Sequence, residues 1–404
     1  MSELTFGIIG LGQRGLSYGQ LLARELSGVG RVTALADINV KRMAGAADLM
    51  GLTDVAFHSD YHDLLADPAI DAVIVTTPDF THELVATDAL MAGKHVLCEK
   101  PLATTVEGRH KIMKARGARQ VLQVGFVLRY NRVYETAYKI IARGDIGRVQ
   151  QIIATDNRQG ADYFRRWHRF RDKSGGLFNH KSTHTLDIIN WFAGGSPVQV
   201  DAMGGLGVFK PGKWQGQRCL SCSLQTQCPE YLDLTIEPYQ SLYLQAESID
   251  GYIRDVCVFT SEKDTIDHGH AMIRYDNGVQ ASYNLSLFAP IDTRQMMVFG
   301  DAGKLELDEA SRSIQVTSRH THDTVEYRVT KDAGGHGGGD EGLMREFVHC
   351  IRRGEQPLAG ALAGAWSCLV SLAAERSALG RRPVTTQQML ADGGIPQGFS
   401  TMSG

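Results

Sequence analysis

Two histidines four residues apart are the clearest candidates for chemistry in this 404-residue chain. In GGLFNHKSTHTLDIINWF, residues 175–192, His180 and His184 flank Lys181, and Asp187 follows one turn later. On a helix, residues i and i+4 share a face, so both imidazoles could reach one metal ion or one substrate. A histidine with an unperturbed pKa of about 6.5 also suits proton transfer. The segment alone leaves a metal site, a proton relay and a plain polar helix open.

A glycine-rich turn, GLGQRG, stands where a strand predicted over residues 4–9 meets a helix predicted over residues 16–26. In dinucleotide-binding units such glycines permit a tight turn, close approach of a diphosphate and packing of the helix on the strand. The helix N-terminus adds free N–H groups for the phosphates. We expect this turn to bind the cofactor through Gly10, Leu11, Gly12, Gln13, Arg14 and Gly15.

The next predicted strand, RVTALAD, ends in Asp37. A carboxylate at this place accepts hydrogen bonds from an adenosine ribose and repels a 2'-phosphate. Arg42 lies nearby and could accommodate that phosphate. The sequence therefore favours NAD as the cofactor and leaves NADP open.

Strands and helices continue to alternate through the first hundred residues. Strands are predicted over residues 55–57, 72–78 and 94–100, and helices over residues 39–50, 61–66 and 82–93. This alternation predicts an α/β fold with a parallel, doubly wound sheet whose ligands lie at the carboxyl ends of the strands. Pro78 and the triplet Glu99-Lys100-Pro101 fall at such ends.

Three segments, GIIGLGQRG, TTPDFTHELVATDALMAGKHVLCEKPLA and IGRV, together resemble the Gfo/Idh/MocA family of glucose-fructose oxidoreductases and inositol dehydrogenases. The resemblance implies a Rossmann domain over residues 1–125. It also implies a substrate-binding and oligomerisation α+β domain over residues 126–404, with a large, mainly antiparallel open sheet. The implied activity is hydride transfer between a secondary alcohol of a sugar, cyclic polyol or sugar derivative and NAD(P).

The same resemblance implies roles for individual residues. Lys100 would lie beside the nicotinamide and the reacting carbon, where a buried cation stabilises a developing alkoxide. Alignment on H-x-x-D makes His184 the proton carrier, and His180 replaces the leading aspartate of the family pattern. Without an H-E-x-x-H motif or a third protein ligand, a proton relay is favoured over a metal site. Further cofactor contacts are expected at Thr77, Pro78, His82, Glu99 and Lys100.

Several other side chains are candidates for substrate binding. His180 and Lys181 are expected in the pocket, and Asp187 either orients His184 or pairs locally. Trp167 and His168 lie in an arginine-rich stretch that could recognise a sugar acid, or could be a solvated loop. The remaining candidates are Arg129 and Tyr130, which the resemblance places near the pocket, and His336, in a glycine-rich loop that closes over substrate or serves as a linker.

The second half of the chain shows hairpin patterns and a cysteine cluster. AMIRYDNGVQASYNLSL predicts a hairpin with a turn at Asn277-Gly278, and MMVFGDAGKLEL predicts another. Cys219, Cys222 and Cys228 have C-x2-C-x5-C spacing, which predicts a structural zinc with Cys257 or a histidine as fourth ligand. Reduced thiols and a disulfide remain alternatives.

Composition narrows the partners. A net charge of -3 gives no broad basic field for nucleic acid, and no stretch approaches the roughly 20 apolar residues that cross a bilayer. We expect a cytoplasmic homo-oligomer, a dimer or tetramer formed through the open sheet, acting on a small sugar or polyol. A glycoside-cleaving enzyme that oxidises its substrate transiently and a non-catalytic dinucleotide sensor are the rival functions.

Overall fold

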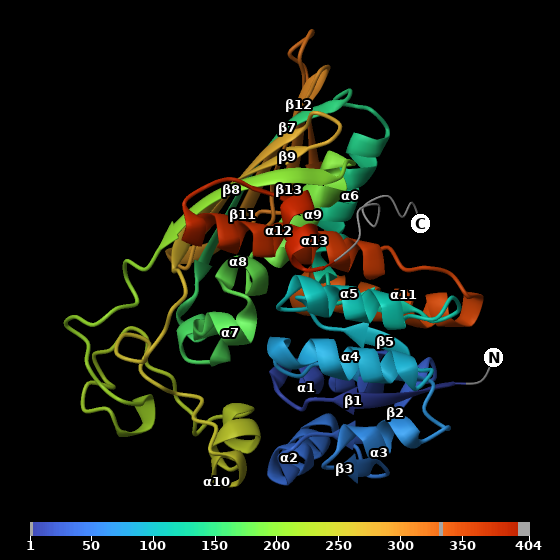
Figure 1. The fold of residues 1–404 in the computed structure, drawn as a ribbon, viewed down its shortest axis with the longest axis vertical. Coiled ribbons are helices and arrows are strands. Elements are labelled where there is room, and N and C mark those ends of the chain that lie inside the picture. The colour runs from blue at the N-terminus through green and yellow to red at the C-terminus, as the bar shows by residue number, and fades with distance from the viewer. Residues whose placement is uncertain (1–2, 331–333, 395–404) are drawn as a thin grey trace.

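The computed structural model describes residues 3–330 and 334–394, which form two sheets with helices packed on each (Figure 1). The smaller sheet and its helices occupy one end of the molecule, and the larger sheet occupies the other. Helices α5, α11 and α12 lie between them.

The first sheet has six parallel strands in the order β3-β2-β1-β4-β5-β6. Its central strand β4 has the sequence AVIV and is buried at all four positions, as expected for a parallel sheet covered on both faces. The predicted doubly wound sheet is therefore confirmed. Its strands are β1 (Leu4–Ile9), β2 (Gly30–Ala36), β3 (Ala56–His58), β4 (Ala72–Val75), β5 (His95–Cys98) and β6 (Leu122–Val124). Its helices are α1 (Gln13–Gln20), α2 (Val40–Met50), α3 (Tyr61–Ala66), α4 (His82–Met91) and α5 (Val106–Ala115).

The second sheet has nine strands in the order β14-β13-β12-β11-β7-β10-β9-β8-β15. Neighbouring strands are antiparallel except β7 and β10, which are parallel. Its strands are β7 (Val149–Gln159), β8 (Pro197–Gly205), β9 (His268–Tyr275), β10 (Gln280–Ser286), β11 (Phe288–Gly300), β12 (Gly303–Asp308), β13 (Ser313–Ser318), β14 (Thr324–Arg328) and β15 (Val384–Thr385).

Both predicted hairpins are present in this sheet. Strands β9 and β10 pair antiparallel around Asn277 and Gly278, and Gly278 has a φ of +90°, which favours glycine. Along β10 every second residue is buried, because one face of the sheet packs on helices. Strands β11 and β12 form the second hairpin.

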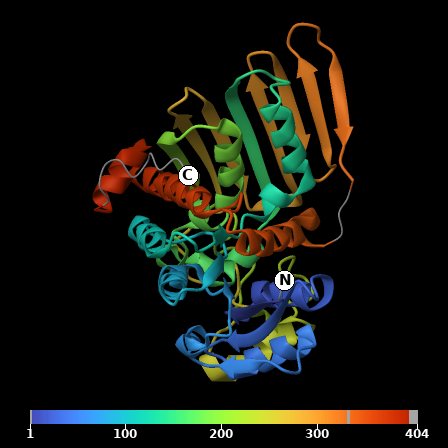
Figure 2. The ribbon, with the colours of Figure 1, turned by 90° about the vertical axis from the view of Figure 1, so that its right-hand side faces the viewer.

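Helices cover one face of the second sheet. Figure 2 shows α6 (Arg132–Ala142) and α9 (Thr183–Ala193) lying against it, and α12 (Ala361–Gly380) packs on β8. Outside this cover, the side chains of Met203 and Met272 are 65% and 58% exposed. The shorter helices are α7 (Arg171–Ser174), α8 (Leu177–His180), α10 (Glu247–Asp250) and α13 (Thr386–Asp392).

The late helices also complete the first half of the molecule. Helix α11 (Gly339–Arg353) brings Phe347 to 6.3 Å from Phe6 of β1, measured between ring centroids. Gly360, before α12, bridges to Gln123 of β6. The two halves of the chain therefore share one continuous hydrophobic core.

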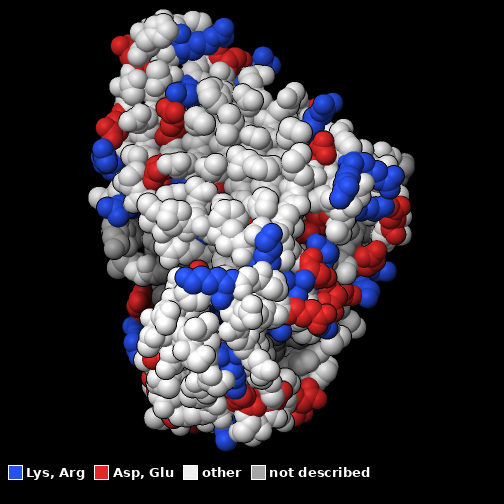
Figure 3. Space-filling model, turned by 90° about the vertical axis from the view of Figure 1, so that its left-hand side faces the viewer, with Lys and Arg blue, Asp and Glu red and all other residues white. Residues whose placement is uncertain are grey.

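Residues 206–267, called the excursion below, leave the second sheet between β8 and β9. They run along the side of the molecule to the first sheet, where α10 lies beside α2 (Figure 1). On the surface of the molecule that carries the excursion, Lys and Arg are interspersed with Asp and Glu (Figure 3). Among the described residues no helix is both long and apolar enough to cross a bilayer.

Candidate active site

The glycine turn after β1 has the geometry that a dinucleotide needs. Gly10 has a φ of +94°, and a Cβ there would lie 2.7 Å from the backbone nitrogen of Thr77. A Cβ on Gly15 would lie 2.2 Å from the carbonyl oxygen of Gly10, so a side chain at either position would clash with backbone. Gly12 faces open space apart from the Tyr243 hydroxyl at 3.5 Å. Together with the buried Thr77 hydroxyl, which has no hydrogen-bond partner among the described residues, this turn fits a bound diphosphate.

Asp37 lies at the end of β2 and faces the same turn. Its Oδ2 accepts a hydrogen bond from the Leu11 amide at 2.8 Å, and its Oδ1 accepts from the Asn39 amide at 2.9 Å. Arg42 donates to the same Oδ1 at 3.0 Å. Asp37 is thus fixed beside the glycine turn, at the place expected for a ribose-binding acid.

Lys100 follows β5 and lies at the same edge of the sheet. Its Nζ donates to the carbonyl oxygen of His180 at 2.9 Å, which connects the first sheet to the histidine segment. Burial lowers the pKa of Lys100, although the carboxyl groups of Asp79 and Glu99 oppose this shift. Lys100 is therefore a buried cation next to both predicted histidines.

Glu99 anchors the strand end that carries Lys100. One carboxylate oxygen accepts hydrogen bonds from Arg14 at 2.5 Å and from Tyr18 at 2.9 Å, and the other accepts from the Lys100 amide at 2.9 Å. Arg14 also pairs with Asp340 at 2.7 Å. Arg14 and Glu99 were predicted to contact the cofactor. In the structure their side chains bind each other, and Glu99 fixes the backbone of Lys100.

The expectation that His180 and His184 share one face of a single helix is wrong. Helix α8 ends at His180, and α9 begins at Thr183. Two buried partners come from different halves of the molecule: His180 contacts Asp79, which follows β4, and Lys181 contacts Asp156 in β7. The break between α8 and α9 therefore lies where two successive side chains bind partners in different parts of the molecule.

His180 lies in a rigid polar and aromatic cluster. Its Nδ1 lies 2.5 Å from Oδ2 of Asp79, and its ring stacks on that of His168 with centroids 3.7 Å apart. The ring of Trp167 meets it edge-on at 5.4 Å. Burial lowers the pKa of His180, and the nearby Lys100 lowers it further. His180, Trp167 and His168 are thus brought together, and Asp79 joins them although sequence reasoning did not select it.

His184 lies in a different environment. Its ring centroid is 6.4 Å from that of Phe126 and 6.4 Å from that of His336. Its buried Nδ1 has no hydrogen-bond partner among the residues that the structure describes. Burial lowers the pKa of His184, and Lys100 again adds to the shift. The imidazole is therefore neutral at physiological pH and able to accept a proton.

The glycine-rich loop that carries His336 closes on this site. His336 has a φ of +49°, its Nδ1 lies 3.0 Å from Asp340, and its carbonyl accepts a hydrogen bond from Asn131 at 2.9 Å. Since Asp340 also binds Arg14, the loop is linked to the glycine turn. The structure thus places the ring of His336 near that of His184, and a contact of His336 with substrate stays a prediction.

Four predicted substrate contacts are engaged with other protein groups. Arg129 and Asp187 form a bidentate ion pair at 2.7 and 2.9 Å, and the Tyr130 hydroxyl binds Glu346. Lys181 is 3% exposed, and its Nζ lies 2.6 Å from Asp156. Burial lowers its pKa to about 7, although Asp156 opposes that shift. The carboxylate of Asp187 is therefore bound by Arg129, 58 residues away in the sequence, and the expected local pairing is not the one found.

His82 supports the cofactor edge through its backbone contacts. Its two ring nitrogens lie 2.7 Å from the carbonyl oxygen of Pro101 and 3.0 Å from that of Thr77. It thereby joins the strand ends after β4 and β5. The segment around Thr77 is linked in this way to Pro101, the residue after Lys100.

The structural zinc expected at Cys219, Cys222 and Cys228 is not supported. Within residues 3–330 and 334–394, no group of three His, Cys, Asp or Glu side chains is arranged to hold a metal ion. These cysteines and Cys257 are free, and burial raises the pKa of the Cys219 and Cys228 thiols. Arg218 instead holds this part of the excursion together through Glu247 and Asp255.

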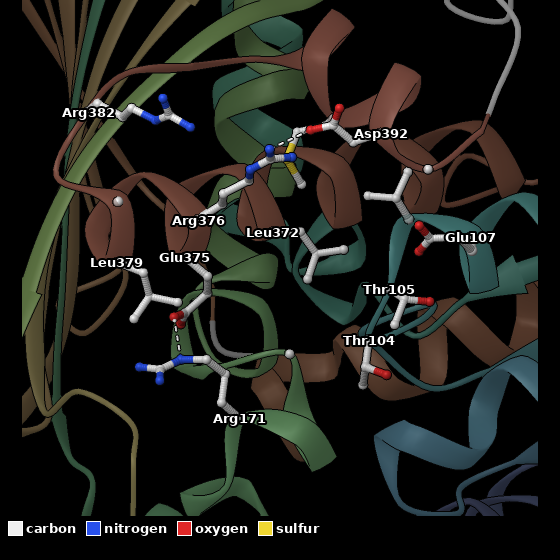
Figure 4. Close-up of a pocket in the computed structure, with 15 residues that line it drawn as sticks. Thr104, Thr105, Glu107, Arg171, Leu372, Glu375, Arg376, Leu379, Arg382 and Asp392 are labelled. Carbon is white, nitrogen blue, oxygen red and sulfur yellow. Dashed lines mark hydrogen bonds and ion pairs between the residues drawn. The ribbon is translucent and has the colours of Figure 1, made fainter.

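A cavity of about 620 Å³ lies between α5, α7, α12 and α13, with none of the residues around Lys100 in its lining (Figure 4). Two of its arginines are paired, Arg171 with Glu375 and Arg376 with Asp392. Glu375 accepts a hydrogen bond from the Phe178 amide at 2.7 Å and so anchors α8. Burial raises the pKa of Glu375 to about 7. Through Glu375, the wall of this cavity therefore helps to position the histidine segment.

Two family descriptions match the chain. Residues 4–126 match an oxidoreductase family with an NAD-binding Rossmann fold, and residues 139–386 match the C-terminal alpha/beta domain of the same family. The chain belongs to the Gfo/Idh/MocA oxidoreductase family. The predicted family, the oxidoreductase activity and the NAD-binding Rossmann fold are thereby confirmed.

Individual members of the family are similar to this chain over different lengths. The protein YteT of Bacillus subtilis (strain 168) is 30% identical over 89% of this chain and 92% of its own length. Inositol 2-dehydrogenase 2 of Saccharopolyspora erythraea is 34% identical over 49% of this chain and 56% of its own length.

Solved structures share the fold of this family member. Levoglucosan dehydrogenase in complex with NADH and levoglucosan has a TM-score of 0.74 at 21% identity and covers 96% of this chain and 100% of its own. The myo-inositol 2-dehydrogenase of Lactobacillus plantarum has a TM-score of 0.69 at 21% identity, with 95% and 99% covered.

Proposed function

We propose that this Gfo/Idh/MocA member oxidises a secondary alcohol of a sugar, cyclic polyol or sugar derivative and transfers the hydride to NAD. The observation that carries the proposal is the position of Lys100, bonded to the histidine segment at the strand edge that holds the glycine turn. Relatives named as inositol 2-dehydrogenases support the substrate class. The proposal retains the division into a Rossmann domain, residues 1–125, and a substrate-binding domain, residues 126–404.

Lys100 and His184 supply the groups that alcohol oxidation requires. Bound NAD would accept the hydride, which leaves the carbinol carbon with both electrons of the C–H bond. The Lys100 ammonium stabilises the negative charge that develops on the substrate oxygen. The hydroxyl proton passes to His184, whose neutral imidazole is the accepting form.

His180 orients the substrate instead of taking its proton. Asp79, as a carboxylate, accepts a hydrogen bond from Nδ1 of His180, which leaves Nε2 as an acceptor for a second substrate hydroxyl. Burial raises the pKa of Asp79, while the positive charges of Lys100 and Arg166 favour its ionised form. Trp167 and His168 extend this wall of the pocket, and His336 closes it from the opposite loop.

NAD is the proposed cofactor in preference to NADP. Arg42, the cation that could receive a 2'-phosphate, is already bound to Asp37 at 3.0 Å, to Asp250 at 2.5 Å and to the carbonyl oxygen of Leu242 at 3.1 Å. Asp37 itself repels a phosphate at that position. Initial rates with saturating NAD and NADP test this preference, and a faster reaction with NADP would contradict it.

We propose a cytoplasmic homo-oligomer, a dimer or tetramer, assembled through the exposed face of the second sheet. Met203 and Met272 on β8 and β9 are exposed apolar side chains on this sheet. Exposed apolar side chains on a sheet face that no helix covers are consistent with a protein interface. Sedimentation of the purified protein would show a monomer if the proposal is wrong.

A panel of cyclic polyols, free sugars, anhydrosugars and aryl glycosides tests the proposed reaction. NADH formation and aglycone release are followed together in the presence of NAD. Net NADH from a sugar or polyol supports the proposal. NAD-dependent aglycone release without net NADH would replace it with the glycoside-cleaving activity, and NAD binding without either product would favour a sensor.

A further inference from the structure

The excursion makes a connection much longer than the sheet requires. It joins β8 to β9, which are neighbours and pair antiparallel up to Gly205 and His268. A short turn would connect two such strands. Instead the chain travels to the first sheet, where α10 packs beside α2 (Figures 1 and 2). The contacts that the excursion makes with the first half of the molecule therefore need an explanation.

Buried polar side chains of α2 and of Asn39, just before it, bind the part of the excursion that lies farthest from the second sheet, residues 241–250. Asn39, which is fully buried, donates to the carbonyl oxygen of Ala246 at 2.9 Å. Arg42, 8% exposed, donates to the carbonyl oxygen of Leu242 and forms the ion pair with Asp250. A Cβ on Gly45 would lie 3.2 Å from the carbonyl oxygen of Ser241, so the backbones approach closely. These contacts fix the excursion against the cofactor-binding half.

The same end of the excursion reaches the glycine turn. The backbone N–H of Gln13, the first residue of α1, donates to the Tyr243 hydroxyl at 3.3 Å. This hydroxyl is also the one described atom within 4 Å of a Cβ placed on Gly12, apart from its chain neighbours. Free N–H groups at this position are the ones that bind the diphosphate in a Rossmann domain. The Tyr243 hydroxyl therefore lies beside the N–H groups that would bind a phosphate oxygen.

A buried arginine with unused hydrogen-bond donors lies behind Tyr243. The guanidinium of Arg254 is 5.6 Å from the centre of the Tyr243 ring, and Arg254 is fully buried. One of its nitrogens binds Asp162 at 2.8 Å, but Nε and Nη1 have no hydrogen-bond partner among the described residues. A buried cation with unused donors favours an anion nearby.

We propose that Tyr243 is a cofactor-binding residue: its hydroxyl donates a hydrogen bond to the NAD diphosphate, and the excursion clamps the bound cofactor and slows its release. In the structure, the hydroxyl accepts a hydrogen bond from the Gln13 amide. On binding, a phosphate oxygen takes the Gln13 donor, and the hydroxyl turns to that oxygen. The proposal rests on NAD binding at the glycine turn and is independent of the substrate identity.

The test compares Tyr243→Phe with Tyr239→Phe in the full chain. Tyr239 lies in the same part of the excursion, with its ring 6.3 Å from that of Tyr243, but makes no described hydrogen bond to the glycine turn. Because one hydrogen bond to a charged group is lost, Tyr243→Phe should weaken binding of NAD and of ADP-ribose about tenfold. Adenosine, which lacks the diphosphate, should bind unchanged, and Tyr239→Phe should match the wild type with all three.

A second variant measures the clamp directly and guards against a folding defect. Asp250→Asn removes the ion pair that ties the excursion to α2 and should speed NAD dissociation in stopped-flow experiments. If Tyr243→Phe folds, unchanged or tighter binding of NAD by this variant would overturn the proposal. If Tyr243→Phe does not fold, an unchanged rate of NAD dissociation from Asp250→Asn would overturn it. Both readouts need no turnover, so failure to oxidise polyols would contradict the proposed function and leave this proposal standing.

Discussion

The two histidines of the site, His180 and His184, differ in how firmly the protein holds them. His180 is bound at Nδ1 by Asp79 and stacked on His168. His184 has an unpartnered Nδ1 in the described part of the chain and lies against Phe126 and the loop of His336. One imidazole is fixed in orientation, and the other is less restrained by polar contacts.

This difference suggests a division of labour between orientation and proton transfer. A histidine whose Nδ1 is held by a carboxylate presents one defined nitrogen to a ligand. A proton carrier must gain and lose a proton in each cycle, which a strong, fixed partner opposes. The comparison therefore places substrate orientation at His180 and proton transfer at His184.

Replacing Lys100 removes the buried cation of the site and should have the largest effect. Lys100→Met should lower turnover by at least on the order of 100-fold, because the alkoxide loses its buried counter-charge. The dissociation constant for NAD, measured by titration, should change little. Lys111→Met, at an exposed lysine paired with Glu83, is the control and should behave as the wild type.

Replacing His184 tests the proton-transfer side of the comparison. His184→Asn should lower kcat on the order of 100-fold, because no group then accepts the hydroxyl proton. Steady-state NADH formation measures this loss. His62→Asn, at an exposed histidine, provides a matched control. A kcat loss in His180→Asn larger than in His184→Asn would exchange the two assigned roles.

Replacing Asp79 tests the orientation side and should have a smaller effect. Asp79→Asn keeps the side-chain shape but removes the charge that orients His180, so kcat/KM should fall roughly tenfold with NAD affinity unchanged. Partial recovery in Asp79→Glu would support a positioning role. Asp60→Asn, which alters an exposed Asp60–His62 pair, should leave kcat/KM unchanged. Equal activity in Asp79→Asn and the wild type would contradict this role.

The pH dependence should show the smallest effect. Because burial and Lys100 lower the pKa of His184, its neutral form persists below the ordinary histidine value of about 6.5. The kcat/KM profile should therefore stay level as pH falls to about 6.5 and decline only below it. An acid limb above about pH 7 would show that the accepting group is not His184.

The parts of the fold that could be predicted from the sequence are those that depend on short stretches of neighbouring residues. The glycine turn, the AVIV strand and the Asn277-Gly278 hairpin each depend on residues close together in the chain, and the structure contains all three. The zinc prediction failed because cysteine spacing does not fix where the thiol groups point. The prediction of a single helix was wrong, and the spacing of the histidines carries no information about the distant acids that bind His180 and Lys181 at the break between α8 and α9.

The contacts that the sequence did not predict join distant parts of the chain. Asp79 and His180 are 101 residues apart, and Gln13 and Tyr243 are 230 apart. A periodic pattern carries no information on such pairs. Asp79 directly follows the strand predicted over residues 72–78, and this position was the available signal for it, whereas Tyr243 lies in a segment without a regular pattern.

Single-turnover hydride transfer tests the central claim, that Lys100 and the two histidines form the reaction centre. NAD-saturated protein is mixed with the best substrate of the panel, either unlabelled or deuterated at the reacting carbon, and NADH formation is followed in time. We expect deuterium on the reduced nicotinamide, a slower reaction with the labelled substrate, and loss of this phase in Lys100→Met. Equal rates of hydride transfer in Lys100→Met and the wild type would contradict the account.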